Sequence, residues 1–310
     1  MFAESLIALV GVLSVQAAKE PPATVLALNS LPVAKYTSSS GAEPPEKKNA
    51  DSFGVDITAR AGAVLDVATG NFLFEKNANT AYPIASLTKL ITIMTFLDQN
   101  PNLDDEVTIA SQDNDPYEKA VFPAGERFTK RELLHAVLIG SVNAAAAALA
   151  RSTGDHDAFL RAMNEKARSL NMSHAQFFDP TGLDPRNKAS AKDVALALRA
   201  SLSYHEIRDA TEQDEFDVTG RASGKPYHIK TTNLLLNSFL NKNPFRIVAG
   251  KTGSLPEAGF CLAQATRNDQ GNQIIAVVLG SENHFARFQD VKSLTWWAFK
   301  NYSWSNLAAD

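Results

Sequence analysis

Strand patterns lie at both ends of the globular part of this chain, and helical patterns fill its middle. An apolar run at residues 61–67, a turn at 68–71 and a second run at 72–74 predict a β-hairpin. Three β-branched or apolar runs separated by Gly and Asn predict adjacent antiparallel strands at 246–249, 260–265 and 274–279. This order predicts an α/β (α+β) fold in which an antiparallel sheet joins the early hairpin to the late strands, is flanked by helices and has an all-helical lobe inserted.

The predicted helices have recognisable beginnings and breaks. One runs from Ser86 through an apolar stretch to residue 97, and another is opened by a capping box at Thr129 and Glu132. That second helix stops at 140–143 and restarts as an Ala-rich helix at 144–151. Further amphipathic helices are expected at 157–170 and 190–202, and a last one at 288–302 that packs on the late strands.

The first seventeen residues have the pattern of a signal peptide. The apolar run 6–13 is too short to span a bilayer, and Val15 and Ala17 fit the small positions before a cleavage site. We therefore expect export and cleavage after Ala17. One feature does not fit a signal peptide: no Lys or Arg precedes the apolar run, and Glu4 stands where a positive charge is expected. A mature N-terminal helix is the alternative. Residues 18–53 are expected to form a flexible Pro/Ser-rich arm, and residues 54–310 a single domain.

Composition excludes several classes of function. A net charge of −4 and a pI near 5.9 leave no basic surplus for nucleic acid. Cys261 is the single cysteine and lies in an apolar run, so we expect it to be structural. The six histidines form no His-Glu-x-x-His spacing, and the chain has no Gly-x-Ser-x-Gly elbow. No metal or cofactor is therefore predicted.

Ser86 and Lys89 lie three residues apart at the head of a predicted helix, so their side chains share one face. A serine hydroxyl needs a base to become nucleophilic, and a desolvated lysine is one of the few side chains that can serve without histidine. The alternative is an N-cap serine followed by a solvated lysine, a pattern that a chain of this length contains roughly once by chance.

Two further motifs carry polar side chains at element ends. Ser141-Val142-Asn143 occupies the break between two helices, and Lys251-Thr252-Gly253 follows the strand at 246–249. Without a Cβ, Gly253 would let a substrate backbone pair with an edge strand. A second Ser-x-Asn at 281–283 falls at a strand end and is expected to be a turn.

Ser-x-x-Lys, Ser-x-Asn and Lys-Thr-Gly in this order are typical of penicillin-recognising serine enzymes. The sequence resembles the low-molecular-weight penicillin-binding proteins, the D-alanyl-D-alanine carboxypeptidases and endopeptidases of the S11 peptidase type. Its fold would then be β-lactamase/transpeptidase-like. The blocks that carry the resemblance lie at residues 82–89, 133–145, 178–183, 232–235, 250–253 and 258–261.

The resemblance implies a role for each motif residue. Ser86 would be the nucleophile of an acyl-enzyme, Lys89 its base, and Ser141 the relay of a proton to the leaving amine. Asn143 would hold the peptide amide. On the strand with Gly253, the side chains of Thr252 and Lys251 would bind the terminal carboxylate, and the backbone N–H groups of Ser86 and Ser254 would form the oxyanion hole.

The resemblance also implies partners and a compartment. Substrates would be peptidoglycan stem peptides, β-lactams would be covalent inhibitors, and the protein would act in cell-wall biogenesis and cell shape. It would be periplasmic or in the cell envelope, and peripheral association with the cytoplasmic membrane stays open.

Departures from the family pattern leave alternatives. Val142 stands where Gly is common, and Asp179 replaces a usual Asn. About sixty residues follow Lys251, so the C-terminal β domain and anchor helix of larger carboxypeptidases are not expected. This build also resembles the endopeptidases that cut peptide cross-links.

A class A β-lactamase would need a Glu-x-x-Leu-Asn, which none of the glutamates between Ser141 and Lys251 provides (Glu165, Glu206, Glu212, Glu215). An inactive cell-wall binding module is the non-enzymatic alternative.

Overall fold

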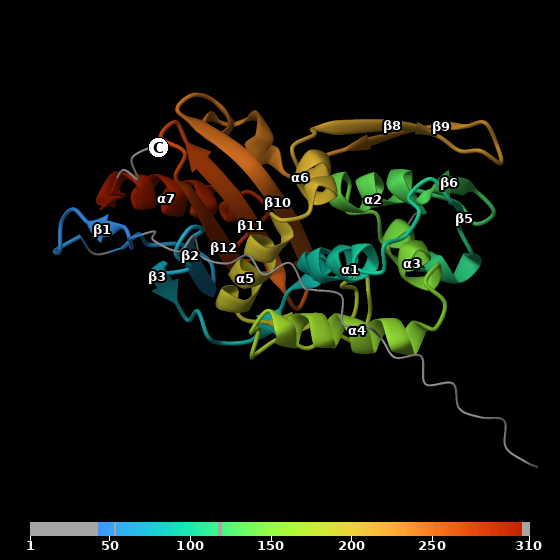
Figure 1. Cartoon of the computed structure of the whole chain (residues 1–310), viewed down its shortest axis with the longest axis horizontal. Helices are drawn as coiled ribbons and strands as arrows, with labels where there is room; N and C mark the ends of the chain where they lie inside the picture. The colour runs from blue at the N-terminus through green and yellow to red at the C-terminus, as the bar shows by residue number, and fades with distance from the viewer. Residues whose placement is uncertain (1–42, 53, 117–119, 306–310) are drawn as a thin grey trace, which may run out of the picture. The chain divides into compact units, whose positions relative to one another are not determined.

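A computed structural model describes residues 43–52, 54–116 and 120–305, shown in Figure 1. The predicted signal peptide and residues 18–42 of the predicted arm lie outside the described residues. The last part of that arm forms strand β1 (Glu46–Lys47), which pairs with β13 (Tyr302–Ser303). Lys48 N also donates to Asn301 O at 2.8 Å, so this segment is held at the end of the last helix.

The predicted sheet is confirmed. It has five antiparallel strands in the order β10-β11-β12-β2-β3. Its strands are β2 (Ala61–Asp66), β3 (Phe72–Lys76), β10 (Phe245–Leu255), β11 (Gly259–Asn268) and β12 (Gln273–Ser281). The early hairpin joins the late strands through β2 and β12, as the sequence predicts. Because β10 is an edge strand, one side of its backbone stays open.

Helices cover both faces of this sheet, and alternate residues of β12 show how. Ile274, Ala276 and Val278 belong to the core under α7 (Ala286–Asn301), with Val291 and Leu294. Ile275, Val277 and Leu279 belong to the larger core on the other face, which includes α5 (Ala191–Ser201) and the lobe helices. Since successive side chains of a strand point to opposite faces, both faces of β12 are buried.

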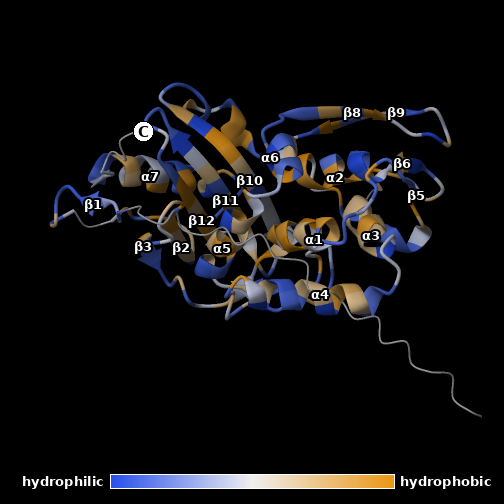
Figure 2. Ribbon diagram, viewed as in Figure 1, coloured by the Kyte–Doolittle hydropathy of each residue, from blue (hydrophilic) through white to orange (hydrophobic). Residues whose placement is uncertain are grey.

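The inserted lobe is also confirmed. It contains α1 (Thr88–Leu97), α2 (Lys130–Ile139), α3 (Asn143–Arg151), α4 (His156–Ser169) and α6 (His205–Thr211). Every residue of α1 from 88 to 96 is buried, and Figure 2 shows this helix largely in the colour of hydrophobic residues. The capping box begins α2 as predicted: Thr129 N donates to Glu132 Oε2 at 2.7 Å, and Glu132 N to Thr129 Oγ1 at 3.2 Å.

Several short elements were not predicted. They include the hairpin of β8 (Glu215–Thr219) and β9 (Pro226–Lys230), the pair of β5 (Glu106–Thr108) and β6 (Arg127–Thr129), and the pair of β4 (Tyr82–Pro83) and β7 (Lys188–Ala189). The described residues also contain four 3₁₀ turns, at Ala85–Leu87 (η1), Ser111–Asp113 (η2), Leu234–Asn237 (η3) and Phe239–Asn241 (η4). Within the described part of the chain, no helix combines the length and apolar character needed to cross a membrane.

Candidate active site

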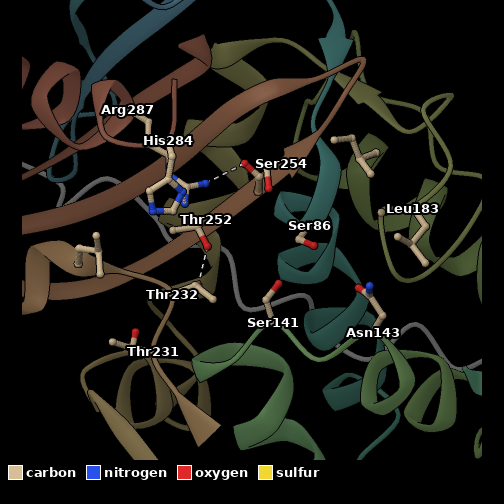
Figure 3. A pocket seen from close by; sticks show the side chains of 14 residues that line it. Ser86, Ser141, Asn143, Leu183, Thr231, Thr232, Thr252, Ser254, His284 and Arg287 are labelled. Atoms are coloured by element: carbon tan, nitrogen blue, oxygen red, sulfur yellow. Dashed lines mark hydrogen bonds between the residues drawn. The ribbon is translucent and has the colours of Figure 1, made fainter. Parts of the chain in front are cut away.

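The three motifs line one cleft of ≈ 410 Å³ between the lobe and the edge strand β10 (Figure 3). Ser86 comes from η1, Ser141 and Asn143 from the turn between α2 and α3, and Thr252, Gly253 and Ser254 from β10. Sequence positions more than 160 residues apart therefore meet at one surface, because β10 packs on η1.

Lys89 lies directly behind the Ser86 hydroxyl. Its Nζ donates to Ser86 Oγ at 2.7 Å, to Asn143 Oδ1 at 2.7 Å and to the carbonyl oxygen of Thr181 at 2.5 Å. The lysine is completely buried. Three acceptors from three segments thus fix the amine within proton-transfer distance of the hydroxyl, which is the geometry required of a nucleophile and its base.

A second lysine stands behind the second serine. Lys251 Nζ donates to Ser141 Oγ at 2.7 Å and to the carbonyl oxygen of Thr252 at 3.0 Å, and the side chain is only 1% exposed. Burial, followed by the charges of Lys89 and Arg287, holds the pKa of Lys251 well below its ordinary value. A lysine in this state can accept and return protons through Ser141.

Glycine at position 253 is required by the protein's own packing. A Cβ there would lie 2.8 Å from Ile84 O and 3.1 Å from Ser86 N. The close approach of β10 to the backbone of the Ser86 turn is thus possible only without a side chain. Beside it, Thr252 Oγ1 and Thr232 Oγ1 share a hydrogen bond of 2.5 Å, which fixes the Thr252 hydroxyl at the cleft (Figure 3).

The sequence interpretation missed Arg287 and His284, which line the cleft from the start of α7. Arg287 Nη1 donates to Gly253 O at 3.1 Å, and Nη2 lies 3.0 Å from His284 Nδ1. The Arg287 side chain is buried, its Nε has no partner among the described residues, and burial lowers its pKa to about 10. No sequence motif marks this arginine, and its position one turn after the last strand is the only available signal.

The structure thus brings all eight predicted site residues together, in two layers. Ser86, Ser141, Asn143, Thr252, Gly253 and Ser254 line the cleft, whereas Lys89 and Lys251 lie behind the hydroxyls. No carboxylate is among the described residues that line it. The cleft therefore combines two lysine-backed hydroxyls with a buried guanidinium, an arrangement suited to acyl transfer on a substrate with an anionic end.

Known proteins with the same organisation are peptidases of the bacterial cell wall. Residues 45–283 match the Peptidase S11 family, described as D-alanyl-D-alanine carboxypeptidase. A D-alanyl-D-alanine endopeptidase of Pseudomonas aeruginosa is 33% identical over 86% of this chain and 84% of its own length. The D-alanyl-D-alanine carboxypeptidase DacF of Bacillus subtilis is 30% identical over 79% of this chain and 63% of its own length.

Solved structures agree with the sequence relatives. The Streptomyces K15 DD-transpeptidase superposes with a TM-score of 0.74 at 26% identity, covering 80% of this chain and all of that one. Penicillin-binding protein D2 of Listeria monocytogenes, in its cefotaxime-bound form, gives 0.67 at 29% identity, covering 79% and 98%. The fold therefore matches the predicted transpeptidase-like architecture. Together with the match over most of its length, this means that the chain belongs to the D-alanyl-D-alanine carboxypeptidase family of S11 serine peptidases.

Proposed function

We propose that the protein is a serine-type D-alanyl-D-alanine carboxypeptidase that acts on peptidoglycan stem peptides through an acyl-enzyme on Ser86. The observation that carries the proposal is the 2.7 Å contact between Lys89 Nζ and Ser86 Oγ at the floor of an open cleft. Burial in general disfavours the charged form of an amine, and the neutral form is the one that can act as a base.

The reaction has two steps in this proposal. Lys89 takes the Ser86 proton while Ser86 Oγ forms a bond to the carbonyl carbon of the penultimate D-Ala. The C–N bond then breaks as the proton that Lys89 took from Ser86 passes through the Ser141 hydroxyl to the leaving amine, while Lys251 holds that hydroxyl across their 2.7 Å contact. Water hydrolyses the ester and frees Ser86. With a β-lactam, the C–N bond that breaks is in the ring, so the leaving amine stays attached and the ester persists.

Substrate recognition follows from the polar groups that remain. The oxyanion would be held by the backbone N–H groups of Ser86 and Ser254, at a few kcal/mol per donor. Thr252 and Arg287 would bind the terminal carboxylate, since Lys251 is already engaged with Ser141 and Thr252 O. Asn143 would orient the acyl-side peptide amide while its Oδ1 holds Lys89.

A fluorescent penicillin tests the nucleophile. The purified protein should become labelled covalently, and Ser86→Ala should remove the label. Ser293→Ala, at an exposed position of α7, is the matched control and should label like the wild type. Unchanged labelling of Ser86→Ala would refute the assignment.

An endopeptidase that cuts D-alanyl cross-links is the second candidate. It is favoured by the similarity to the Pseudomonas endopeptidase, of which this chain covers 84%, against 63% for the Bacillus carboxypeptidase. The two activities differ in what lies beyond the scissile bond, a free D-Ala or a cross-linked peptide. Digestion of purified muropeptides separates them: release of D-Ala supports the carboxypeptidase, and conversion of dimers to monomers supports the endopeptidase.

A β-lactamase and an inactive wall-binding module are less well supported. Fast deacylation needs a carboxylate at the acyl-enzyme, and the described cleft lining offers none. Rapid turnover of a chromogenic cephalosporin would favour the β-lactamase instead. A binding module would retain muropeptides without cleaving them, although both lysine-backed serines are in place here.

The compartment and processing of the chain belong to the same proposal. Export through residues 1–17, an arm over most of 18–53 and a catalytic domain over 54–310 fit a substrate found only outside the cytoplasm. The protein would then work in the periplasm or cell envelope, with peripheral contact to the cytoplasmic membrane as an additional option. Detection of a mature N-terminus at Ala18 in the envelope fraction would test this.

A further inference from the structure

Asp179, the family departure noted in the sequence, is the centre of a tight loop beside the catalytic helix. Its Oδ1 accepts hydrogen bonds from Thr181 N at 2.5 Å, Thr181 Oγ1 at 2.7 Å and Gly182 N at 2.7 Å. Its Oδ2 accepts one from Asp184 N at 2.6 Å and a longer one from Asn187 Nδ2 at 3.4 Å. Five donors thus converge on a single carboxylate, which satisfies an anion without a direct cation.

The same loop touches Lys89 and the backbone before Ser86. The carbonyl oxygen of Thr181 is one of the three acceptors of Lys89 Nζ, at 2.5 Å. Pro180 O accepts from Thr92 Oγ1 of α1 at 2.7 Å, which anchors the loop on the catalytic helix. Thr181 is therefore held from both sides: its N–H and hydroxyl by Asp179, and its carbonyl by Lys89.

We propose that Asp179 is a positioning residue for Lys89, acting through the Thr181 carbonyl, and that its negative charge contributes to this role. The inference rests on the proposed function, in which Lys89 is the base for Ser86. The Gly182 N–H lies in the same peptide unit as the Thr181 carbonyl, so its hydrogen bond to Asp179, with those from the Thr181 N–H and hydroxyl, fixes the direction of the carbonyl that holds the amine. The carboxylate also adds negative potential beside a site that otherwise contains cations.

Asparagine cannot reproduce this arrangement. Each oxygen of Asp179 faces at least two donors, so an Asn would direct its NH₂ group at other N–H or O–H groups whichever way it is turned. At least one donor would lose its acceptor, and the loop would shift. The Thr181 carbonyl would move with it, and a displacement of about 1 Å at a catalytic group can lower a rate by roughly 100-fold.

The charges around Lys89 decide the sign of the pH effect. Lys251 of β10 faces it from the sheet side. Asp179 lies on the loop side with Arg186 nearby, and Arg186 is paired with Asp184. In this proposal the carboxylate of Asp179, which holds the Thr181 acceptor of Lys89, favours a proton on Lys89. Its neutralisation should let Lys89 lose that proton at lower pH, and loss of the Thr181 acceptor acts in the same direction.

The test is the pH profile of acylation by a fluorescent penicillin in Asp179→Asn. We expect the plateau rate to fall roughly 10- to 100-fold, and the midpoint of the acid limb to move down by roughly one pH unit. Asp184→Asn is the matched control, because it is the same change in the same loop and leaves the Asp184 N–H bond to Asp179 intact. It should keep both the plateau and the limb of the wild type, whatever its melting temperature.

Each outcome decides the proposal. A wild-type profile in Asp179→Asn overturns it, and so does a lower plateau with an unmoved or raised acid limb, which is what a purely structural loop would give. An equal shift in Asp184→Asn would also overturn it. If Asp179→Asn does not fold, Thr181→Val removes the hydroxyl that donates to Asp179 and accepts from Leu183 N. It should lower the plateau about tenfold and move the acid limb down, and a wild-type profile would overturn the proposal. Failure of the proposed function would instead appear as labelling that survives Ser86→Ala in the wild-type background.

Discussion

Gly182→Ala is a way to disturb the Ser86 turn without removing a polar group. Gly182 has a φ of +85°, a conformation in which an L-residue is disfavoured by about 1–2 kcal/mol. A Cβ there would also lie 2.1 Å from Ala85 O and 3.0 Å from Ser86 N. Because the obstructing atoms belong to the backbone, no side-chain rotation can relieve the overlap.

The magnitude follows from these two terms. Relief of the overlap requires the loop and the Ser86 turn to separate by about 1 Å, and overpacking of this kind costs about 1–3 kcal/mol. When the cost of the left-handed conformation is added to this overpacking cost, the free energy of unfolding should fall by about 2–5 kcal/mol. For a domain of this size, that lowers the melting temperature by about 4–20 °C. The same displacement moves the nucleophile, so acylation should slow by roughly 100-fold.

Gly125→Ala separates the two terms. Gly125 has nearly the same φ, +89°, but a Cβ there would meet no atom within 4 Å. This control should lose only the conformational part of the stability and acylate penicillin like the wild type. Stopped-flow or gel-based labelling rates and thermal melts would be measured for both variants at equal concentration. The reasoning is refuted if Gly182→Ala acylates at the wild-type rate, or if Gly125→Ala is slowed as much.

Three further predictions use buried titratable groups. Burial lowers the pKa of Lys251 well below its unfolded value of 10.5. Between these two pKa values only the unfolded chain binds the proton, so the free energy of unfolding of the wild type should fall by about 1.4 kcal/mol for each pH unit below 10.5 until the folded pKa is reached. Lys251→Met should lose that pH dependence in urea unfolding and lose penicillin labelling; equal pH slopes would contradict this. The hydrogen bond from Ser223, with three from backbone N–H groups, lowers the pKa of Glu126 from 4.5 to about 2, so its stabilisation is full above pH 4.5 and lost as pH falls through 2. The stability difference between wild type and Glu126→Gln should therefore shrink over that range, and a constant difference would argue against the shift. Burial raises the pKa of the Cys261 thiol to about 11, so a thiol reagent at pH 8 should modify it only on unfolding, whereas fast modification of folded protein would show an exposed site.

The sheet and the lobe could be predicted because their signals are local and repeated. Residues 274–279 alternate between two cores, so an uninterrupted apolar run is what a doubly buried strand requires. The capping box at Thr129 and Glu132 and the break after Gly140 fixed the ends of α2. Short strands such as β8 and β9 offer weaker signals, because β8 has one buried residue, Val218, and β9 has two, Tyr227 and Ile229.

The motif residues predicted from the sequence meet at one cleft, whereas residues that reach the cleft through packing were not predicted. Ser86, Ser141 and Lys251 stand in three short patterns, and the order of these patterns carries the resemblance that implied their roles. Arg287 has no such pattern, since its importance comes from the approach of α7 to β10, where it meets Gly253 O at 3.1 Å. The sequence interpretation noticed Asp179 only as a departure, because its five hydrogen bonds come from a loop geometry that no periodicity encodes.

Backbone strain is the part of the site least accessible from sequence, and it lies beside the hydroxyls of both Ser86 and Ser141. Ala85, which precedes Ser86, has a φ of +48°, and Ser141 itself has a φ of +59°. Each non-glycine residue in this region costs about 1–3 kcal/mol and persists only where its surroundings determine the conformation. Here the surroundings are identifiable. Gly182 and Gly253 pack against the Ala85–Ser86 backbone, and Lys251 Nζ holds the Ser141 hydroxyl. Each strained position lies at or next to a hydroxyl that contacts its own lysine, and the two glycines allow the close packing against the Ser86 turn, so we expect them to be as necessary to the site as Ser86 itself.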